Sequence, residues 1–302
     1  MPAKIVVVGS FNMDLTAYME KMPRPGETLH GHTFKTGPGG KGSNQAVAAA
    51  RLGAEVTFIG RVGEDVFAQA ALDFWKGEGI NTEYVVRDPD HATGVAPIWV
   101  DDNGENSIVV VLGANLAITK ADIDRAADVI AAADVVVVQL EINYDMVEYA
   151  LKVAKAKGVK TILNPAPAGT LAAEVVALAD YLTPNETELE VLSGKTGDYL
   201  EAARSLMTRV GQTVVVTLGS QGAMWLNADG QGTVPIFKVK AVDTTGAGDA
   251  FNGGFAVALG EGKSLEDAVR FGNAVAGLSV TKMGTAPSMP TRAEVEGLLG
   301  SR

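Results

Sequence analysis

Residues 243–254 read DTTGAGDAFNGG, and this stretch decides the fold that we predict for the chain. An alternating apolar run over residues 236–242 precedes it and predicts a strand. After Asp249 the apolar residues recur with the spacing of one helix face. We therefore interpret the stretch as a strand, a glycine turn and the N-terminus of a helix. Such a turn points backbone N–H groups and the positive end of a helix dipole one way, which suits phosphate.

Asp249 has two interpretations within this turn. It could cap the new helix, because Asp is common and stabilising near a helix start. Alternatively, a carboxylate beside a bound phosphoryl group could accept the proton of an attacking hydroxyl. The residues GAGD alone do not separate the two interpretations.

Composition limits the possible functions. The 302 residues are 47% hydrophobic, enough to bury the core of one large α/β domain or two smaller ones. A net charge of -11 argues against a surface for nucleic acid or an anionic membrane, since both attract clustered Lys and Arg. The absence of Cys excludes disulfides, zinc–thiolate sites and thiol nucleophiles. We find no signal peptide and no apolar run of membrane-spanning length, which predicts a cytoplasmic protein.

Helix and strand patterns alternate along most of the chain. KIVVV at residues 4–8 predicts a strand buried on both faces of a parallel sheet. The later predicted strands are 56–60, 135–140, 160–163, 181–183, 213–218, 222–226 and 232–239. The predicted helices are 65–78, 120–132, 145–157, 171–178, 199–210, 249–260, 265–282 and 291–299. This alternation predicts one α/β domain over residues 1–302, with an open, mostly parallel, Rossmann-like sheet and helices on both faces.

A hairpin interrupts the alternation. Residues 95–100 and 107–112 are β-rich, and the DDNG between them contains the Asn-Gly signal of a tight turn. Together with parts of 11–36 they predict a small separate sheet, a lid formed by roughly 11–36 and 94–112. A plain edge hairpin of the main sheet is the alternative. Because a hairpin alone is marginal, its free face favours pairing with a second copy in a homodimer.

Polar or turn residues recur where the predicted strands end. They are Asn12, Asp14, Glu141, Asn164, Asn185, Glu188 and Gly219. In a parallel sheet these ends face one crevice, so convergence favours a site, although each residue alone is more often a cap or turn. Asn185 and Glu188 offer oxygens that suit Mg²⁺, directly or through water. The alternative is that the pair caps a helix at 186–193.

Three local patterns are rejected. The GxGxxG at residues 37–42 lacks a buried strand before it and an acid at the end of the next strand, which argues against dinucleotide binding. GK[ST] triplets occur at 194–196 and 262–264, but a P-loop also needs a glycine five residues before the first glycine. Those positions are Leu189 and Val257, so neither triplet belongs to a P-loop. The histidines at 30, 32 and 91 lack metal-site spacing, and we expect them at the surface. Residues 37–42 are instead predicted to approach a ligand with backbone, with Lys41 and Asn44 projecting into a cleft.

The motifs together resemble the ribokinase (PfkB-type) family of sugar and nucleoside kinases. Residues 243–254 resemble its C-terminal signature, and GGKGSNQA at 39–46 resembles its N-terminal one. The similarity runs from KIVVVGSFNMDL to MGTAPSMP, through QLEI, LNPAPA, the NETE motif and TLGSQG. It implies a ribokinase-like fold and ATP-dependent phosphorylation of a sugar's primary hydroxyl, with D-ribose as first choice. It also implies Mg²⁺ and a monovalent cation such as K⁺.

The resemblance implies roles residue by residue. Asp249 is the base, and the anion hole is Gly246, Ala247 and Gly248. The sugar hydroxyls are held by Asn12, Asp14, Gly40, Lys41, Asn44 and Glu141. The nucleotide is lined by Asn185, Thr217, Gly219, Ser220, Gly222, Gly248 and Asn273, and Asn185 and Glu188 are linked to Mg²⁺. The monovalent cation is held by Asp243, Thr245, Ser279, Lys282, Gly284 and Ser288. The family often has Ala and Arg where Ser279 and Lys282 stand.

Several alternatives stay open. The substrate could be fructose, deoxyribose, a ketogluconate or a nucleoside, although residues 10–45 offer no clear aromatic platform for a base. A non-catalytic sugar-binding protein on this fold would be expected to lose the anion hole or the base, and DTTGAGD is intact. An NAD-dependent oxidoreductase rests only on the isolated GxGxxG.

Overall fold

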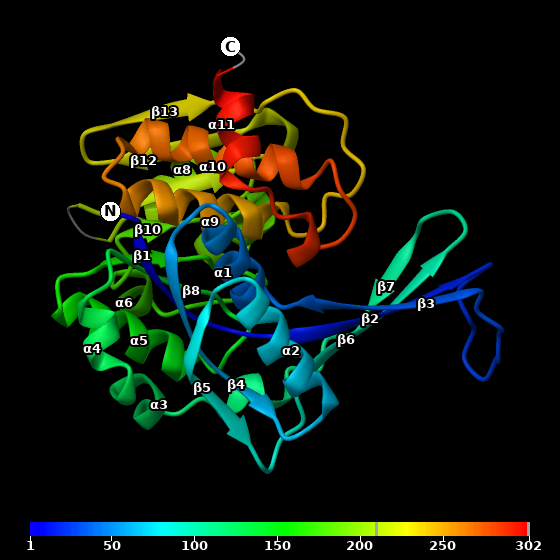
Figure 1. Ribbon diagram of the computed structural model, residues 1–302. Coiled ribbons are helices and arrows are strands. Elements are labelled where there is room, and N and C mark those ends of the chain that lie inside the picture. The colour runs from blue at the N-terminus through cyan, green and yellow to red at the C-terminus, as the bar shows by residue number, and fades with distance from the viewer. Residues whose placement is uncertain (209–210, 301–302) are drawn as a thin grey trace.

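The main sheet has nine strands and confirms the predicted open, mostly parallel α/β architecture (Figure 1). The computed structural model describes residues 1–208 and 211–300. The strand order is β13-β12-β11-β10-β9-β8-β1-β4-β5, and only the pairs that involve β12 are antiparallel. The bounds are β1 Lys4–Val8, β4 Glu55–Gly63, β5 Asn81–Asp88, β8 Val135–Val138, β9 Lys160–Leu163, β10 Tyr181–Leu182, β11 Thr213–Thr217, β12 Ala223–Asn227 and β13 Gly230–Val234.

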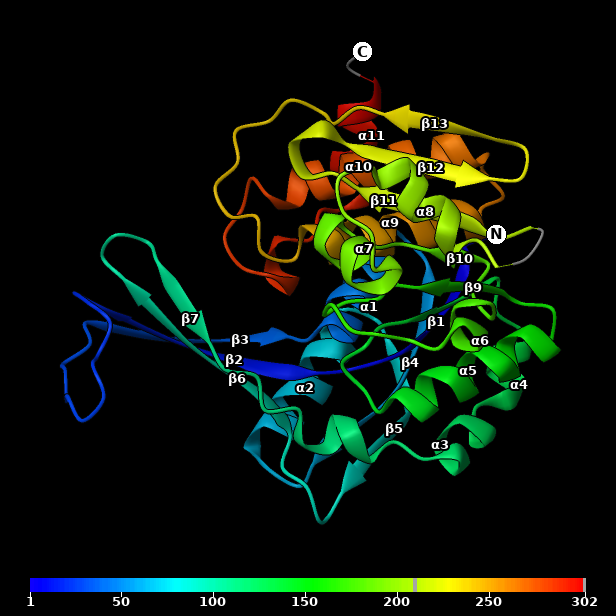
Figure 2. The same ribbon diagram turned by 180° about the vertical axis from the view of Figure 1, so that it is seen from behind.

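Helices cover both faces of the sheet because its interior strands are apolar on both faces, as β1 shows. Ile5 and Val7 pack into one core and Val6 and Val8 into the other, as the alternation of a strand requires. The first core is covered by α1 Lys41–Arg51, α2 Val66–Gly77, α9 Ala247–Gly260, α10 Leu265–Ser279 and α11 Arg292–Gly300 (Figure 1). The second is covered by α3 Lys120–Arg125, α4 Ala127–Ala131, α5 Tyr144–Ala156, α6 Ala173–Val176, α7 Glu186–Ser193 and α8 Tyr199–Leu206 (Figure 2). Within the described residues, no helix is long and apolar enough to cross a membrane.

A second, four-stranded sheet projects from the body of the protein (Figures 1 and 2). Its order is β3-β2-β6-β7, with bounds β2 Asn12–Met19, β3 Thr33–Gly39, β6 Gly94–Asp101 and β7 Asn106–Ile108. The predicted hairpin is β6–β7, in which Ile98 pairs with Ile108. The prediction of a small separate sheet is therefore confirmed over an edge hairpin of the main sheet. Because β2 begins four residues after β1 ends, this sheet starts beside the carboxyl end of β1.

The segment before α9 is not the predicted strand. β13 ends at Val234, and the next residue is Pro235, which has no N–H to donate to a strand ladder. The chain then runs irregularly until the Val242 N–H donates to the Val280 carbonyl at 2.7 Å. The prediction of strands over 236–242 and 232–239 was therefore wrong beyond Val234, and the glycine turn follows a loop.

Other boundaries differ for local reasons. Strand β5 was not predicted, because it is an edge strand of mixed polarity in which nearly all residues are exposed or half-buried and no long apolar run occurs. The predicted helix 120–132 is two helices, α3 and α4, which meet at Ala126. The predicted helix 199–210 ends at Leu206, and its residues 209–210 lie outside the described residues.

Candidate active site

The N-terminus of α9 forms the glycine turn. Gly246 precedes the helix with φ +77°, a left-handed conformation that favours glycine. The Ala247 N–H already donates to the Thr244 carbonyl at 3.2 Å. Gly248 and Asp249 follow in the first helical turn, where no earlier turn supplies carbonyl acceptors. Apart from the neighbouring backbone of α9, a Cβ built on Gly248 would meet no atom of the described residues within 4 Å, so the space in front of this turn is open.

A cavity of about 150 Å³ opens in front of this turn. It lies at the carboxyl ends of β9, β10 and β11, the edge at which open α/β sheets bind ligands. Its lining is Lys41, Asn164, Ala166, Thr183, Asn185, Glu188, Thr217, Thr244, Gly246, Ala247, Gly248, Asp249 and Asn252. The structure thus brings the glycine turn, the NETE motif and Lys41 to one place.

The Asp249 carboxylate faces α1. It is buried, with 6% of its surface exposed. Its Oδ2 accepts a hydrogen bond from Asn44 Nδ2 at 2.9 Å, and its Oδ1 accepts one from Gln45 Nε2 at 3.0 Å. The helix N-cap is Gly246, which makes no side-chain cap. Asp249 is therefore held by a neighbouring helix and does not occupy the N-cap position of its own.

Close packing of α1 on α9 makes these contacts possible. A Cβ on Gly253 would lie 2.5 Å from the Ala48 Cβ and 2.8 Å from the Gln45 carbonyl oxygen. Only glycine fits at that distance, because real Cβ contacts are longer. Gly253, the first glycine of the final GG in DTTGAGDAFNGG, thus sets the helix spacing that the Asp249 contacts need.

Glu141 accepts hydrogen bonds from the start of the second sheet and from the start of α1. Its Oε2 accepts hydrogen bonds from Ser10 Oγ at 2.5 Å and from the Lys41 backbone N–H at 2.9 Å. The Asn12 amide lies 3.4 Å from the same oxygen. Gly40, with φ +88°, turns the chain there, and a Cβ on it would lie 2.6 Å from the Asn12 nitrogen. Residues distant in sequence therefore form one polar cluster.

Two charged side chains have shifted pKa values in this cluster. Burial alone would lower the pKa of Lys41, but the negative charges of Asp249, Glu141 and Glu188 raise it above its usual value. Burial raises the pKa of Asp14 to about 7, opposed by the hydroxyl of Thr285. The Thr285 Oγ1 lies 3.5 Å from the Asp14 carboxylate and 3.3 Å from the Pro38 carbonyl, so Asp14 joins β2 to the segment after α10.

The NETE motif caps α7 and also lines the cavity. Asn185 Oδ1 accepts from the Glu188 N–H at 2.8 Å, and Glu188 Oε2 accepts from the Asn185 N–H at 2.9 Å. Burial raises the pKa of Glu188. Among the described residues no three acidic or histidine side chains cluster as a metal cage. A Mg²⁺ ion here would therefore need further oxygens from phosphate or water, which is ordinary for Mg²⁺.

The residues expected at the nucleotide lie only partly on this cavity. Asn185 and Thr217 line it, and they pair across a β-bridge. The three beyond β11, namely Gly219, Ser220 and Gly222, lie outside its lining, in the turn between β11 and β12. Asn273 is buried, and its amide donates to the Val234 carbonyl at 2.9 Å and to the Pro235 carbonyl at 3.3 Å. Asn273 thus holds the start of the loop that leads to α9.

The six residues expected at the monovalent cation come from two segments that meet. Asp243 accepts from the N–H groups of Thr245 and Gly284, both at 2.9 Å. Burial opposes ionisation, but these hydrogen bonds hold the pKa of Asp243 below its usual value. The Lys282 ammonium turns away to Glu294 at 2.8 Å, so only its backbone could face an ion. The hydroxyls of Ser279 and Ser288 donate to the Ala276 and Thr285 carbonyls.

The polar residues behind the site were not predicted from the sequence. Gln45 contacts Asp249, Gln139 contacts Gln45, and Asn252 donates to the Gly248 carbonyl at 2.8 Å. Thr183 donates to Asn252 at 2.6 Å. The available signal was a polar residue within an otherwise apolar buried segment, as Gln45 is within NQAVAAA.

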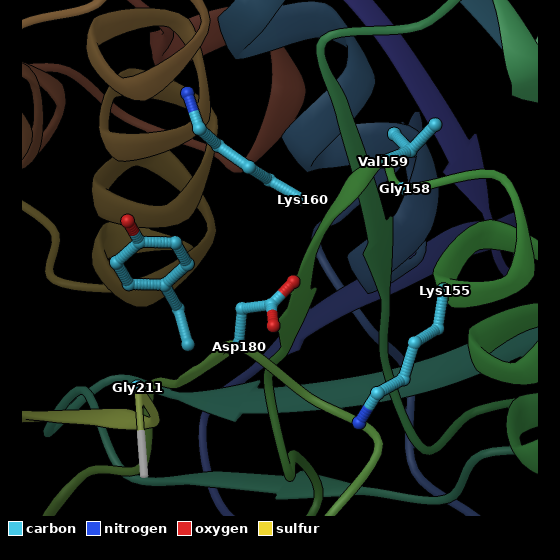
Figure 3. Close-up of a pocket in the computed structure, with 7 residues that line it drawn as sticks. Lys155, Gly158, Val159, Lys160, Asp180 and Gly211 are labelled. Carbon is cyan, nitrogen blue, oxygen red and sulfur yellow. The ribbon is translucent and has the colours of Figure 1, made fainter.

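A second cavity, of about 320 Å³, lies at the other end of the strands, where β9 and β10 begin (Figure 3). Lys155 donates to the Ala177 carbonyl and Lys160 to the Leu259 carbonyl. Asp180 accepts hydrogen bonds from Thr161. These charged side chains hold the fold together, and we assign the cavity no chemistry.

A helix N-terminus that opens on a cavity, with a buried carboxylate beside it at the carboxyl edge of an open α/β sheet, is an arrangement that suits phosphoryl transfer to a small molecule. The model of the pfkB family carbohydrate kinases matches residues 2–292, and the chain belongs to this family. The resemblance found in the sequence is confirmed: the chain is a sugar kinase of the ribokinase type.

Similar proteins cover nearly the whole chain. A ribokinase from Bacillus subtilis is 44% identical over 295 residues, covering 98% of this chain and 99% of that protein. A deoxyribokinase from Salmonella typhi is 43% identical over 292 residues, covering 95% of each. The structure of Arabidopsis thaliana ribokinase complexed with ribose and ATP has a TM-score of 0.91 at 35% identity and covers 99% of each chain.

Proposed function

We propose that this chain transfers the γ-phosphoryl group of ATP to the primary hydroxyl of D-ribose, giving ribose 5-phosphate and ADP. The observation that carries the proposal is the buried Asp249 carboxylate, fixed by two amide donors beside the open first turn of α9. Ribokinases similar along the full chain, one of them solved with ribose and ATP, support the choice of substrates.

Asp249 accepts the proton of the sugar hydroxyl as that oxygen attacks the γ-phosphorus. The first turn of α9, at Gly246, Ala247 and Gly248, stabilises negative charge on the phosphoryl oxygens. Asn44 Oδ1 is buried and has no hydrogen-bond partner within the described part of the chain, so it can accept a sugar hydroxyl.

The other sugar hydroxyls are bound by the cluster around Glu141. Its members Asn12, Asp14, Gly40 and Lys41 surround Glu141 from β2 and the start of α1. Carboxylates accept from hydroxyls and Lys41 donates to them, so the cluster suits a free, hydroxyl-rich sugar.

The phosphates of ATP extend from α9 toward β11. Thr217, Gly219, Ser220, Gly222 and Asn273 line the nucleotide in this proposal. Asn185 and Glu188 would hold Mg²⁺ through phosphate or water oxygens, and the ion when bound neutralises phosphate charge. A monovalent cation, K⁺, would be held by the Asp243 loop with Thr245, Ser279, Lys282, Gly284 and Ser288, mostly through backbone carbonyls.

The second sheet serves as a lid and as a dimer surface. Closure over the sugar would keep water from accepting the phosphoryl group. Phe34, Ile108 and Val110 expose 64%, 49% and 46% of their surface on or next to this sheet, an apolar area that a second copy would cover in a homodimer. Light scattering tests this, and a monomer at working concentration would contradict it. Because the proposed reaction uses ATP, we expect the protein to act in the cytoplasm.

Deoxyribose is the second candidate substrate, because the Salmonella typhi deoxyribokinase is similar over the same length. Coupled ADP release with ribose, 2-deoxyribose, fructose, a ketogluconate and a nucleoside, with and without K⁺, tests the choice. We expect the highest kcat/KM with ribose. A higher value with deoxyribose would reassign the substrate, and binding without turnover would favour a non-catalytic sugar-binding protein.

A further inference from the structure

A row of three buried side-chain amides, Gln139, Gln45 and Asn164, lies behind Asp249, and Gln45 and Gln139 lie outside the lining of the cavity. Gln139 Nε2 donates to Gln45 Oε1 at 2.8 Å. Gln45 Nε2 donates to Asp249 Oδ1 and to Asn164 Oδ1, both at 3.0 Å. Gln45 and Gln139 are each 1% exposed. The row crosses from the end of β8 through α1 to α9 and the end of β9, so it connects the sheet to the carboxylate.

The orientation of each amide in the row is determined by its neighbours. A glutamine can present either its carbonyl oxygen or its NH₂ group to a partner. The Gln45 oxygen is taken by the Gln139 NH₂ group, so the Gln45 NH₂ group must face Asp249 and Asn164. Asn164 uses its own NH₂ group on the Thr183 carbonyl at 3.0 Å, which leaves its oxygen to accept. Asp249 Oδ1 therefore always meets a donor.

Gln139 keeps this orientation although its own side-chain oxygen makes no hydrogen bond within the described residues. Gln139 Oε1 is buried without a hydrogen-bond partner in the described residues. It lies so close to Gly9 that a Cβ on Gly9 would be only 2.3 Å from this oxygen. Turning the amide over would place the Gln139 oxygen against the Gln45 oxygen, which is repulsive. The unpartnered oxygen is thus the consequence of directing the Gln139 NH₂ group at Gln45.

We propose that Gln45, oriented by Gln139, is a positioning residue for Asp249. It occupies Oδ1 as a donor, favours the ionised carboxylate and leaves Oδ2 toward the sugar side, where Asn44 also lies. In the reaction the sugar O–H bond breaks, its proton passes to Asp249, the sugar oxygen bonds to the γ-phosphorus, and ADP leaves. The inference rests on the proposed function, because it takes Asp249 as the base of that transfer.

Gln45→Met tests the proposal, since it removes both N–H donors at similar volume. Loss of a hydrogen bond to a charged group is expected to lower kcat about 10- to 100-fold. The KM for ribose should stay within about threefold, because Gln45 does not line the cavity. The acid limb of the kcat profile should move to higher pH, because a donor that favours the carboxylate is lost. The charged groups around Asp249, which are Asp14, Lys41, Glu141 and Glu188, remain in place.

Gln139→Met tests whether Gln139 orients Gln45, because without the Gln139 NH₂ group the Gln45 amide can turn over. We expect a smaller change in the same direction, and the double variant should match Gln45→Met instead of multiplying the two effects. Gln212→Met is the matched control. Gln212 is fully buried and donates to the Val176 carbonyl at 2.7 Å, away from the cavity. It should lower the unfolding midpoint but leave kcat and its pH profile unchanged.

A wild-type kcat and pH profile in Gln45→Met would overturn the proposal. If the two effects multiply in the double variant, Gln139 does not act through Gln45. If Gln45→Met does not fold, Gln139→Met decides by the same two readouts. Asp249→Asn separates this inference from the proposed function. Turnover in Asp249→Asn would show that Asp249 is not the base and would contradict the proposed function. An inactive Asp249→Asn together with a normal Gln45→Met would contradict only the positioning role of Gln45.

Discussion

The amide of Asn44 donates to the carboxylate of Asp249 at 2.9 Å across 205 positions of sequence. This contact joins the two family signatures at the proposed reacting atoms. Asp249→Asn should fold and bind ribose, since the change is isosteric and costs only the acceptor of one of the two amide donors, but it cannot accept the sugar proton. A general base contributes about 10²- to 10⁴-fold, so kcat should fall by at least that range. Coupled ADP release and calorimetric ribose binding measure the two effects, and near-normal kcat would remove Asp249 from the base role.

Gly248→Ala should abolish phosphoryl transfer without harming the fold. The new Cβ enters the open space in front of α9, where the phosphoryl group would be bound, and meets no protein atom within 4 Å. Alanine also favours a helix over glycine by about 1 kcal/mol, so the unfolding midpoint should hold or rise. Gly277→Ala in α10 is the control, because its Cβ would make only an ordinary 3.8 Å contact with Phe237. Turnover of Gly248→Ala equal to that of Gly277→Ala would contradict the anion hole.

Gly253→Ala should harm both stability and turnover from outside the cavity. Its Cβ would approach Ala48 to 2.5 Å and force α9 away from α1. Overpacking of this kind costs about 1–3 kcal/mol of unfolding free energy. It would also lengthen the contact between Gln45 and Asp249, so kcat should fall while KM changes little. Denaturant unfolding and steady-state kinetics measure this, with Gly297→Ala on α11, where a Cβ meets nothing within 4 Å, as control.

Much of the fold could be predicted because local patterns agree with the tertiary structure. KIVVV is apolar on both faces and forms β1, an interior strand of the main sheet, and DDNG closes the hairpin of the second sheet. The edge strand β5 and the loop at 236–242 could not be predicted this way. β5 has no apolar run of its own, and the loop alternates like a strand although Pro235 and its position outside the sheet prevent pairing.

The candidate site was predicted where backbone and motif determine it, and missed where only tertiary contact does. Gly246 and Asp249 lie in a turn that the sequence itself predicts. Gln45 and Gln139 are 94 positions apart, and no local spacing relates them. Their meeting depends on glycines that let α1 approach β1 and α9, and periodicity carries no information about that approach.

Asp14 should make stability depend on pH. Burial raises its folded pKa to about 7 from a reference value of 3.8, so the folded state holds a proton that the unfolded chain has lost. Its stabilising contribution is complete below about pH 4 and is lost as pH rises through 7. Asp14→Asn should therefore gain in unfolding free energy relative to wild type between pH 5 and pH 8, without sugar. A constant difference across this range would contradict the buried protonated state, and Asp73→Asn on the exposed face of α2 should show no such gain.

Asp243→Asn should weaken the response to K⁺. Asp243 holds two loop segments together by accepting from Thr245 through one oxygen and from Gly284 through the other. An asparagine has a single acceptor oxygen, so one of these N–H groups loses its partner and the segments separate. Wild-type kcat should rise as KCl replaces choline chloride at constant ionic strength, and the variant should respond less. An equal response to K⁺ in both proteins would show that Asp243 does not take part in the cation effect. No response in wild type would remove the monovalent cation from the proposed mechanism.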